Sequence, residues 1–170
     1  MEEPLEAQIG RRLIQKNYKL AVSESCTGGL IGHRITNIPG SSEYYLGSVT
    51  AYAYEAKERL LGVHHETLAT YGAVSQETVL EMAQGIRRSL AADFPLEKTV
   101  GLSVSGIAGP GGGMPGKPVG LVWIGLSTPD GDWAWQYLWT GNRIENKEYS
   151  AQAALQRLMD YLNEQVLPES

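Results

Sequence analysis

The sequence predicts an α/β fold, a three-layer α/β/α sandwich in which helices cover both faces of a mixed β-sheet. Segments typical of helices and strands alternate in the first part of the chain, which favours parallel strands joined by crossover helices. Two strand-like segments then follow one another across a short turn, which favours an antiparallel hairpin. The chain has 170 residues and no low-complexity linker, so one domain is expected over residues 1–170.

The N-terminal elements follow from apolar spacing and from turn residues. Apolar side chains recur at helical spacing in the first segment, at Leu5, Ile9, Leu13 and Ile14. Thr27 is expected to be the N-cap of a later helix that Pro39 and Gly40 close. In chain order the expected elements are a helix over 4–16, a strand over 19–23, a helix over 27–38, an aromatic-rich strand over 44–54 and a short helix over 55–61.

The C-terminal elements include the longest expected helices. Ser75 is a suitable N-cap, and an apolar stripe follows it. The hairpin is expected to turn at residues 129–132, where Pro, Asp and Gly gather. The expected elements are a long helix after Ser75, a strand over 100–104, hairpin strands over 119–127 and 133–139, and a final helix over 145–166.

Composition narrows the classes of function. A net charge of -5 and a pI near 5.2 argue against a duplex nucleic-acid binder, because such proteins concentrate Lys and Arg. The single cysteine, Cys26, excludes an internal disulfide and fits a reducing compartment. No apolar stretch is long enough to span a bilayer, so a cytoplasmic protein without membrane attachment is expected.

The most informative segment is the polar run from Ser23 to Gly29, which lies between the first expected strand and the second expected helix. Backbone N–H groups at a helix start lack intrahelical partners and carry partial positive charge. A nucleophile such as Ser25, or an anion site, fits this junction. The alternative is that these Ser and Thr residues only cap the helix.

A serine nucleophile needs a base, and Lys57 is a candidate for it. The three histidines, His33, His64 and His65, show no recognisable pairing with an acid, so a Ser-His-Asp triad is unsupported. A lysine can act as the base when burial lowers its pKa. Tyr52, five residues earlier, has a hydroxyl that can donate a hydrogen bond to the same site. The alternative is a solvated lysine between Glu55 and Glu58.

The segment from Gly106 to Pro118 is too rich in glycine and proline for regular structure. Its second half nearly fits the phosphate-loop pattern, but Pro118 lacks the hydroxyl that would bind magnesium, and a strand follows instead of a helix. Either a flexible surface loop or a backbone cradle close to a ligand remains. No metal site is predicted, because adjacent His64 and His65 are poorly placed to converge on one ion.

Six short blocks occur in the order seen in a known family: Glu24–Gly29, Pro39–Ser42, Tyr52 with Glu55–Lys57, Gly72–Ser75, Ser105–Pro110 and Lys117–Gly120. On these blocks, the chain resembles the CinA C-terminal domain family, whose members include nicotinamide-nucleotide amidases. The resemblance covers about residues 8–165, so a stand-alone member without the N-terminal domain of longer CinA proteins is expected.

The resemblance implies hydrolysis of the carboxamide of nicotinamide mononucleotide, a pyridine nucleotide, without any cofactor. It implies that Ser25 is the nucleophile, that Lys57 is its base and that Tyr52 is a supporting hydrogen-bond donor or proton shuttle. It also implies a homo-oligomer. The alternative is a non-catalytic nucleotide-binding or protein-interaction module that retains the motif for folding.

The substrate phosphate requires an anion site. We expect it at the N–H groups of Thr27, Gly28 and Gly29, or of the loop with Gly106, Ala108 and Gly109. Arg143 matches a Gly-Asp-Arg block of the family and can add a side-chain charge. The chain departs from that block with Asn142 in place of Asp, and it has Lys147 where a second arginine is common.

Overall fold

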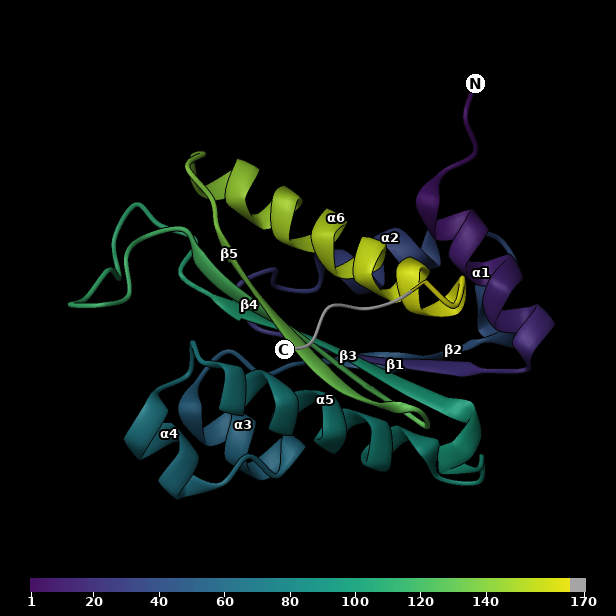
Figure 1. Ribbon diagram of the computed structural model, residues 1–170, viewed down its shortest axis with the longest axis horizontal. Helices are drawn as coiled ribbons and strands as arrows, with labels where there is room; N and C mark the ends of the chain where they lie inside the picture. The colour runs from purple at the N-terminus through teal and green to yellow at the C-terminus, as the bar shows by residue number, and fades with distance from the viewer. Residues whose placement is uncertain (166–170) are drawn as a thin grey trace.

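A computed structural model describes residues 1–165 and shows one five-stranded mixed sheet with helices on both faces (Figure 1). The sheet order is β2-β1-β3-β4-β5. The first three of these strands are parallel to one another, and β4 and β5 add an antiparallel hairpin. The strands are β1 (Lys19–Glu24), β2 (Tyr45–Thr50), β3 (Thr99–Gly106), β4 (Leu121–Thr128) and β5 (Gly131–Leu138). The predicted three-layer α/β/α sandwich is therefore confirmed.

The helices form two layers. In Figure 1, one face of the sheet is covered by α1, α2 and α6, and the other face by α3, α4 and α5. The helices are α1 (Leu5–Lys16), α2 (Leu30–Thr36), α3 (Tyr54–Leu61), α4 (His65–Tyr71), α5 (Gln76–Ala91) and α6 (Arg143–Leu162). Short 3-10 turns lie at Ser41–Glu43 and Leu96–Lys98.

The central strands form the middle of the core. Side chains of β1 and β3 are buried almost without interruption, because helices cover both of their faces. A large cluster lies between the sheet and the layer of α1, α2 and α6, and a smaller one lies under α3, α4 and α5. Two buried layers hold the sheet rigid, so the strand ends are fixed points for a site.

Several predicted boundaries change in the structure. The second strand ends at Thr50 rather than at residue 54, because Tyr54 already begins α3. Thr27 is not the N-cap of α2. Gly29, with a φ of 102°, holds that position, because a left-handed turn precedes the helix. Ile14, expected in the apolar stripe of α1, is 49% exposed.

Other predictions hold. Ser75 caps α5 by accepting a hydrogen bond from the Thr78 N–H, and β4 and β5 form the predicted hairpin. The short helix α4 was not predicted. The last residue of the predicted final helix, Val166, lies outside the described residues, and the helix itself ends at Leu162.

The α3 helix is seated on α5 through a glycine. A Cβ atom built on Gly85 would lie 1.8 Å from the carbonyl oxygen of Leu61, the last residue of α3. Only glycine permits this approach, because a Cβ would force the two helices apart. Since α3 carries Lys57, the position of that lysine depends on this contact.

We therefore expect Gly85→Ala to lower the free energy of unfolding by about 1–3 kcal/mol, through overpacking against α3. Chemical denaturation measures this change. The matched control is Gly111→Ala, because a Cβ at Gly111 meets nothing within 4 Å. A Gly85→Ala variant as stable as the control would show that the two helices separate without cost.

Candidate active site

The candidate site lies where β1 and β3 end. Ser25 follows the last residue of β1, and its N–H donates to the carbonyl of Val104 in β3 at 3.1 Å. Carboxyl ends of parallel strands are where open α/β sheets usually bind ligands. The neighbouring strand β2 leads through residues 51–53 into α3, which carries Lys57. Three adjacent strands therefore determine where the serine and the lysine lie.

Ser25 and Lys57 are in direct contact. The Lys57 Nζ lies 3.0 Å from the Ser25 Oγ, so the two atoms are within hydrogen-bond distance. The lysine side chain is 1% exposed and the serine 7%. The solvated lysine considered above is therefore ruled out. Direct contact between a hydroxyl and a buried amine is the arrangement that a serine nucleophile with a lysine base requires.

Two backbone carbonyls orient the amine. The Lys57 Nζ donates to the carbonyl of Ala51 at 2.8 Å and to the carbonyl of Tyr52 at 3.0 Å. A neutral amine has two N–H bonds and one lone pair. When both N–H bonds donate to these carbonyls, the lone pair is left for the Ser25 hydroxyl, and the amine can accept its proton.

Burial lowers the pKa of Lys57 from its ordinary 10.5 to about 8, because the charged form loses hydration. Among residues 1–165, no carboxylate forms an ion pair with this amine. An acid nearby would stabilise the ammonium form and raise the pKa. A substantial fraction of the amine is therefore neutral near physiological pH.

The neighbouring thiol is a poor competitor. Cys26 is 5% exposed, and burial raises the pKa of its thiol to about 12. The thiolate is the nucleophilic form of cysteine, and at neutral pH it is scarcely populated here. Of the two adjacent candidates, the geometry therefore favours Ser25.

Only some of the backbone N–H groups in the turn after Ser25 are paired. Gly28 donates its N–H to the Ser25 carbonyl, and Leu30 donates to the Thr27 carbonyl. Within the described chain, the N–H groups of Cys26, Thr27 and Gly29 donate to no protein acceptor. Of the three predicted anion donors here, Gly28 is therefore occupied, whereas Thr27 and Gly29 remain free to stabilise an oxyanion.

Tyr52 and the glycine-rich loop meet at Arg143. The Tyr52 side chain is 61% exposed, and its hydroxyl accepts a hydrogen bond from Arg143 Nη2 at 3.2 Å. Arg143 Nη1 donates to the Gly109 carbonyl at 2.7 Å. Tyr52 thus contacts Lys57 through its carbonyl and contacts Arg143 through its phenol. Its hydroxyl lies at the rim of the site and can donate its own proton outward.

The glycine-rich loop divides into two parts. Its first part lies at the site, where Gly106 ends β3 and Ala108 is nearly buried, its carbonyl accepting a hydrogen bond from Asn146. Its second part projects away from the body of the molecule between β3 and β4 (Figure 1). Beside the first part, a groove of about 390 Å³ continues to the start of α6, lined by Ala108, Gly109, Pro110, Val119 and Gly141–Ile144.

Two cations border the site from α6. Arg143 and Lys147 are one turn apart, and the Lys147 Nζ lies 3.8 Å from the position that a Cβ on Gly28 would take. Neither forms an ion pair with a carboxylate of the described residues. Asn142, which replaces the usual Asp, still caps α6 by accepting from the Glu145 N–H.

The site also contains groups that the sequence alone did not reveal, namely Glu24 and the carbonyl of Ala51. Glu24 is fully buried at the end of β1, and no Lys or Arg of residues 1–165 forms an ion pair with it. The only sequence signal was an acidic residue at the end of a buried strand. Backbone carbonyls such as that of Ala51 leave no sequence signal at all.

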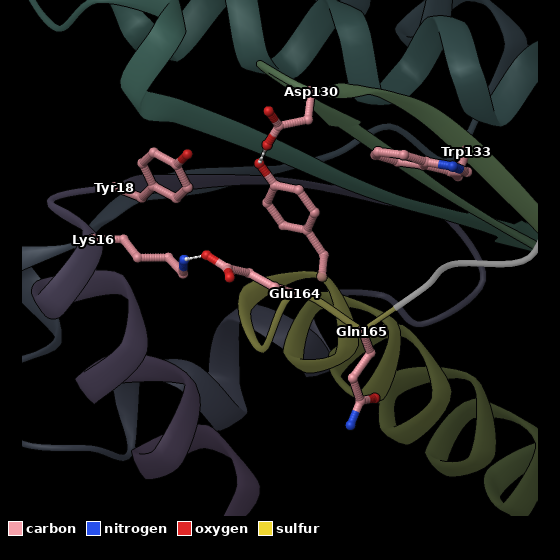
Figure 2. A pocket seen from close by; sticks show the side chains of 7 residues that line it. Lys16, Tyr18, Asp130, Trp133, Glu164 and Gln165 are labelled. Carbon is pink, nitrogen blue, oxygen red and sulfur yellow. Dashed lines mark hydrogen bonds and ion pairs between the residues drawn. The ribbon is translucent and has the colours of Figure 1, made fainter.

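A second pocket lies at the opposite end of the sheet (Figure 2). There the Tyr161 hydroxyl donates to Asp130 at 2.7 Å, and Lys16 pairs with Glu164 at 2.8 Å. Four of the polar side chains of this pocket thus pair with one another, and none of the predicted site residues lines it. It belongs to the packing of the α6 end against β1 and the β4–β5 turn.

Two searches of the described residues were negative. Residues 1–165 contain no group of three or more His, Cys, Asp or Glu side chains placed to bind a metal ion. None of their helices is both long and apolar enough to cross a membrane.

Comparison with protein-family models gives a match to the CinA C-terminal domain over residues 2–162. A CinA-like protein of Desulforapulum autotrophicum is 49% identical over 152 residues, covering 89% of this chain and 34% of that protein. A CinA-like protein of Desulfosudis oleivorans is 50% identical over 155 residues, covering 91% of this chain and 36% of that protein. The chain thus spans about a third of the length of these relatives.

Solved structures of CinA superfamily proteins have the same fold as this chain. A CinA superfamily protein from Klebsiella pneumoniae is 31% identical and superimposes with a TM-score of 0.87, covering 94% of this chain and 96% of that one. The competence/damage-inducible protein CihA from Agrobacterium tumefaciens is 34% identical with a TM-score of 0.82, covering 96% and 98% of the two chains.

Proposed function

This chain belongs to the CinA C-terminal domain family, and we propose that it is an amidase that converts nicotinamide mononucleotide to nicotinic acid mononucleotide and ammonia. The observation that supports this most strongly is the buried contact of 3.0 Å between Lys57 Nζ and Ser25 Oγ. The reaction needs a nucleophile, a base and an oxyanion site, and the described residues supply candidates for all three.

In the first step, Ser25 Oγ attacks the carboxamide carbon, and its proton passes to the Lys57 amine. The negative charge that develops on the carboxamide oxygen is stabilised by the free N–H groups of Cys26, Thr27 and Gly29. The Lys57 ammonium then returns the proton to the departing nitrogen, so that the C–N bond breaks and ammonia leaves. A nicotinoyl ester on Ser25 remains.

In the second step, water attacks this ester. Lys57 accepts a proton from the water and returns it to Ser25 Oγ as the ester bond breaks. Nicotinic acid mononucleotide leaves, and the serine and the amine recover their starting states. The original serine proton therefore leaves with ammonia, a proton of water replaces it on Ser25 Oγ, and the net reaction consumes one water molecule per amide.

The rim groups are proposed to hold the rest of the substrate. Arg143 and Lys147 supply two positive charges that form no ion pair with a carboxylate of residues 1–165, and a phosphate pairs well with such groups. The glycine-rich loop beside Arg143 carries the N–H groups of Ala108 and Gly109, which are proposed as further donors to the phosphate. Tyr52, whose hydroxyl is held by Arg143, is proposed to donate a hydrogen bond to the bound substrate. Self-association of the chain and its cytoplasmic location remain predictions from the sequence.

Ammonia release from nicotinamide mononucleotide without added metal tests the proposal. We expect Ser25→Ala and Lys57→Met each to lower kcat by a factor of about 100 or more, because each removes one member of the proton-transfer pair. Cys26→Ala should keep most of the activity, because the buried thiol is not the nucleophile. Activity that survives Ser25→Ala and disappears in Cys26→Ala would reverse the assignment.

Calorimetry separates the amidase from the non-catalytic module. Nucleotide binding by the unmodified chain with no ammonia after prolonged incubation would favour the module.

The rate should also depend on pH in a defined direction. Lys57 acts as a base only when neutral, and burial places its pKa at about 8. Activity should therefore rise with pH through a midpoint near 8 and fall below it as the amine becomes protonated. Measuring kcat/KM from about pH 6 to about pH 10 checks this, because that range extends about two pH units to each side of the midpoint. A rate that is flat across this range would exclude Lys57 as the base.

The phosphate assignment makes a separate prediction. Lys147→Ala should raise KM for nicotinamide mononucleotide about tenfold with little change in kcat, because it removes one charge-assisted contact to the phosphate. The same variant should not affect the corresponding nucleoside, which lacks the phosphate. Lys16→Ala, at the opposite end of the sheet, is the matched control. An equal loss on nucleotide and nucleoside would place the phosphate elsewhere.

A further inference from the structure

Glu24 is the buried acid beside the nucleophile, and the chemistry described above does not use it. It is the last residue of β1, directly before Ser25, and its relative exposure is 0%. Burying a carboxylate without compensation is costly, and no Lys or Arg of the described residues pairs with it. The buried carboxylate therefore needs hydrogen-bond donors in place of an ion pair.

Hydrogen bonds supply that compensation. The carboxylate accepts from the Thr27 hydroxyl at 2.6 Å, from the Ile31 N–H at 2.9 Å and from the Gly32 N–H at 3.1 Å. The last two donors belong to the first turn of α2, where the helix dipole favours a negative charge. The carboxylate thus occupies two N–H donors at the N-terminus of α2, so these two groups are not available to a substrate phosphate.

The same bonds span the nucleophile turn. The turn runs from Ser25 to Gly29, and Glu24 contacts residues within it and just after it while being covalently joined to its start. The N–H groups of Cys26, Thr27 and Gly29, which are free for an oxyanion, lie between these fixed points. Their direction is therefore set by the carboxylate.

The backbone of Glu24 also reaches the lysine. Its carbonyl accepts the N–H of Ala51 at 2.9 Å, and the Ala51 carbonyl in turn accepts from Lys57 Nζ at 2.8 Å. One residue is therefore joined to both halves of the candidate pair, to Ser25 by the peptide bond and to Lys57 through Ala51.

We infer that Glu24 is a positioning residue, whose carboxylate holds the turn after Ser25 so that the serine and the oxyanion donors face the reacting carbonyl group. This inference rests on the proposed function. The positioning role requires a group at residue 24 that accepts three hydrogen bonds. A glutamine presents one oxygen and one NH₂ group, and the NH₂ would face an N–H donor of α2.

The test measures Ser25 reactivity without the nucleotide. p-Nitrophenyl acetate transfers its acetyl group to the serine oxygen and releases p-nitrophenol, while mass spectrometry locates the acetyl group and Ser25→Ala gives the background. We expect Glu24→Gln to acetylate Ser25 about tenfold more slowly, because one N–H donor of α2 loses its acceptor and the turn before it is held less firmly. The pH midpoint of the reaction should stay where the unmodified chain has it, because the lysine environment is unchanged.

A second variant, Thr27→Val, removes only the hydroxyl donor to Glu24 and should give a smaller loss of acetylation rate. If Glu24→Gln does not fold, Thr27→Val tests the inference in its place.

Glu81 is the matched control, since it also accepts three hydrogen bonds, from the His64 N–H, the His64 ring and the Thr67 hydroxyl, and it anchors α4 to α5 away from the site. Glu81→Gln should lower the melting temperature but leave the acetylation rate unchanged. With nicotinamide mononucleotide, Glu24→Gln should lower kcat and leave KM nearly constant.

Three results would overturn the inference. Folded Glu24→Gln that reacts as fast as the unmodified chain would show a purely structural carboxylate. A shifted pH midpoint would show that the charge acts on Lys57 instead. An unmodified chain whose Ser25 does not acetylate would remove the nucleophile on which the inference depends. By contrast, an unmodified chain that acetylates Ser25 but releases no ammonia would refute only the proposed substrate.

Discussion

The organisation of this protein depends on a buried primary amine that has no acidic partner. Removing an ammonium ion from water is unfavourable, so burial lowers the pKa of Lys57 to about 8. The Ala51 and Tyr52 carbonyls fix two of its hydrogen-bond directions, and the third meets Ser25. A carboxylate in this position would have stabilised the pair as an ion and removed its basicity. Among the described residues, no such group pairs with the amine, as the proposed role of a base requires.

The scaffold places this pair through features that lie outside it. Three parallel strands end at one edge, so the serine after β1 and the chain after β2 come together there. The α3 helix is seated on α5 at Gly85, which brings Lys57 beneath the edge. The α6 helix then adds Arg143 and Lys147 at the rim. The hydrophobic layers thus fix the geometry, and a few polar groups at the strand ends supply the groups for the proposed chemistry.

The sequence was sufficient for the fold class, because alternating apolar segments leave local signals. A family motif also singled out Ser25 and Lys57, which the fold brings into contact. It failed where specific hydrogen bonds of the folded chain decide. Thr27 is a good N-cap by residue type, yet its hydroxyl donates to Glu24 and Gly29 takes the cap position. The α4 helix buries only Leu68, so it has no apolar period to detect, and contacts such as that of His64 with Glu81 hold it. The roles of Glu24 and of the Ala51 carbonyl depend on partners that only the folded chain brings near.

The most direct test of this account is the titration of Lys57 itself. Lysine side chains labelled with ¹³C at the ε-carbon can be followed by NMR across pH, and the Lys57 resonance can be assigned by its loss in Lys57→Met. We expect its midpoint at about 8, well below the ordinary lysine value of 10.5. A Lys57 midpoint at the ordinary value would mean that the amine is charged at working pH. In that case it could not accept the serine proton, and the central claim would be wrong.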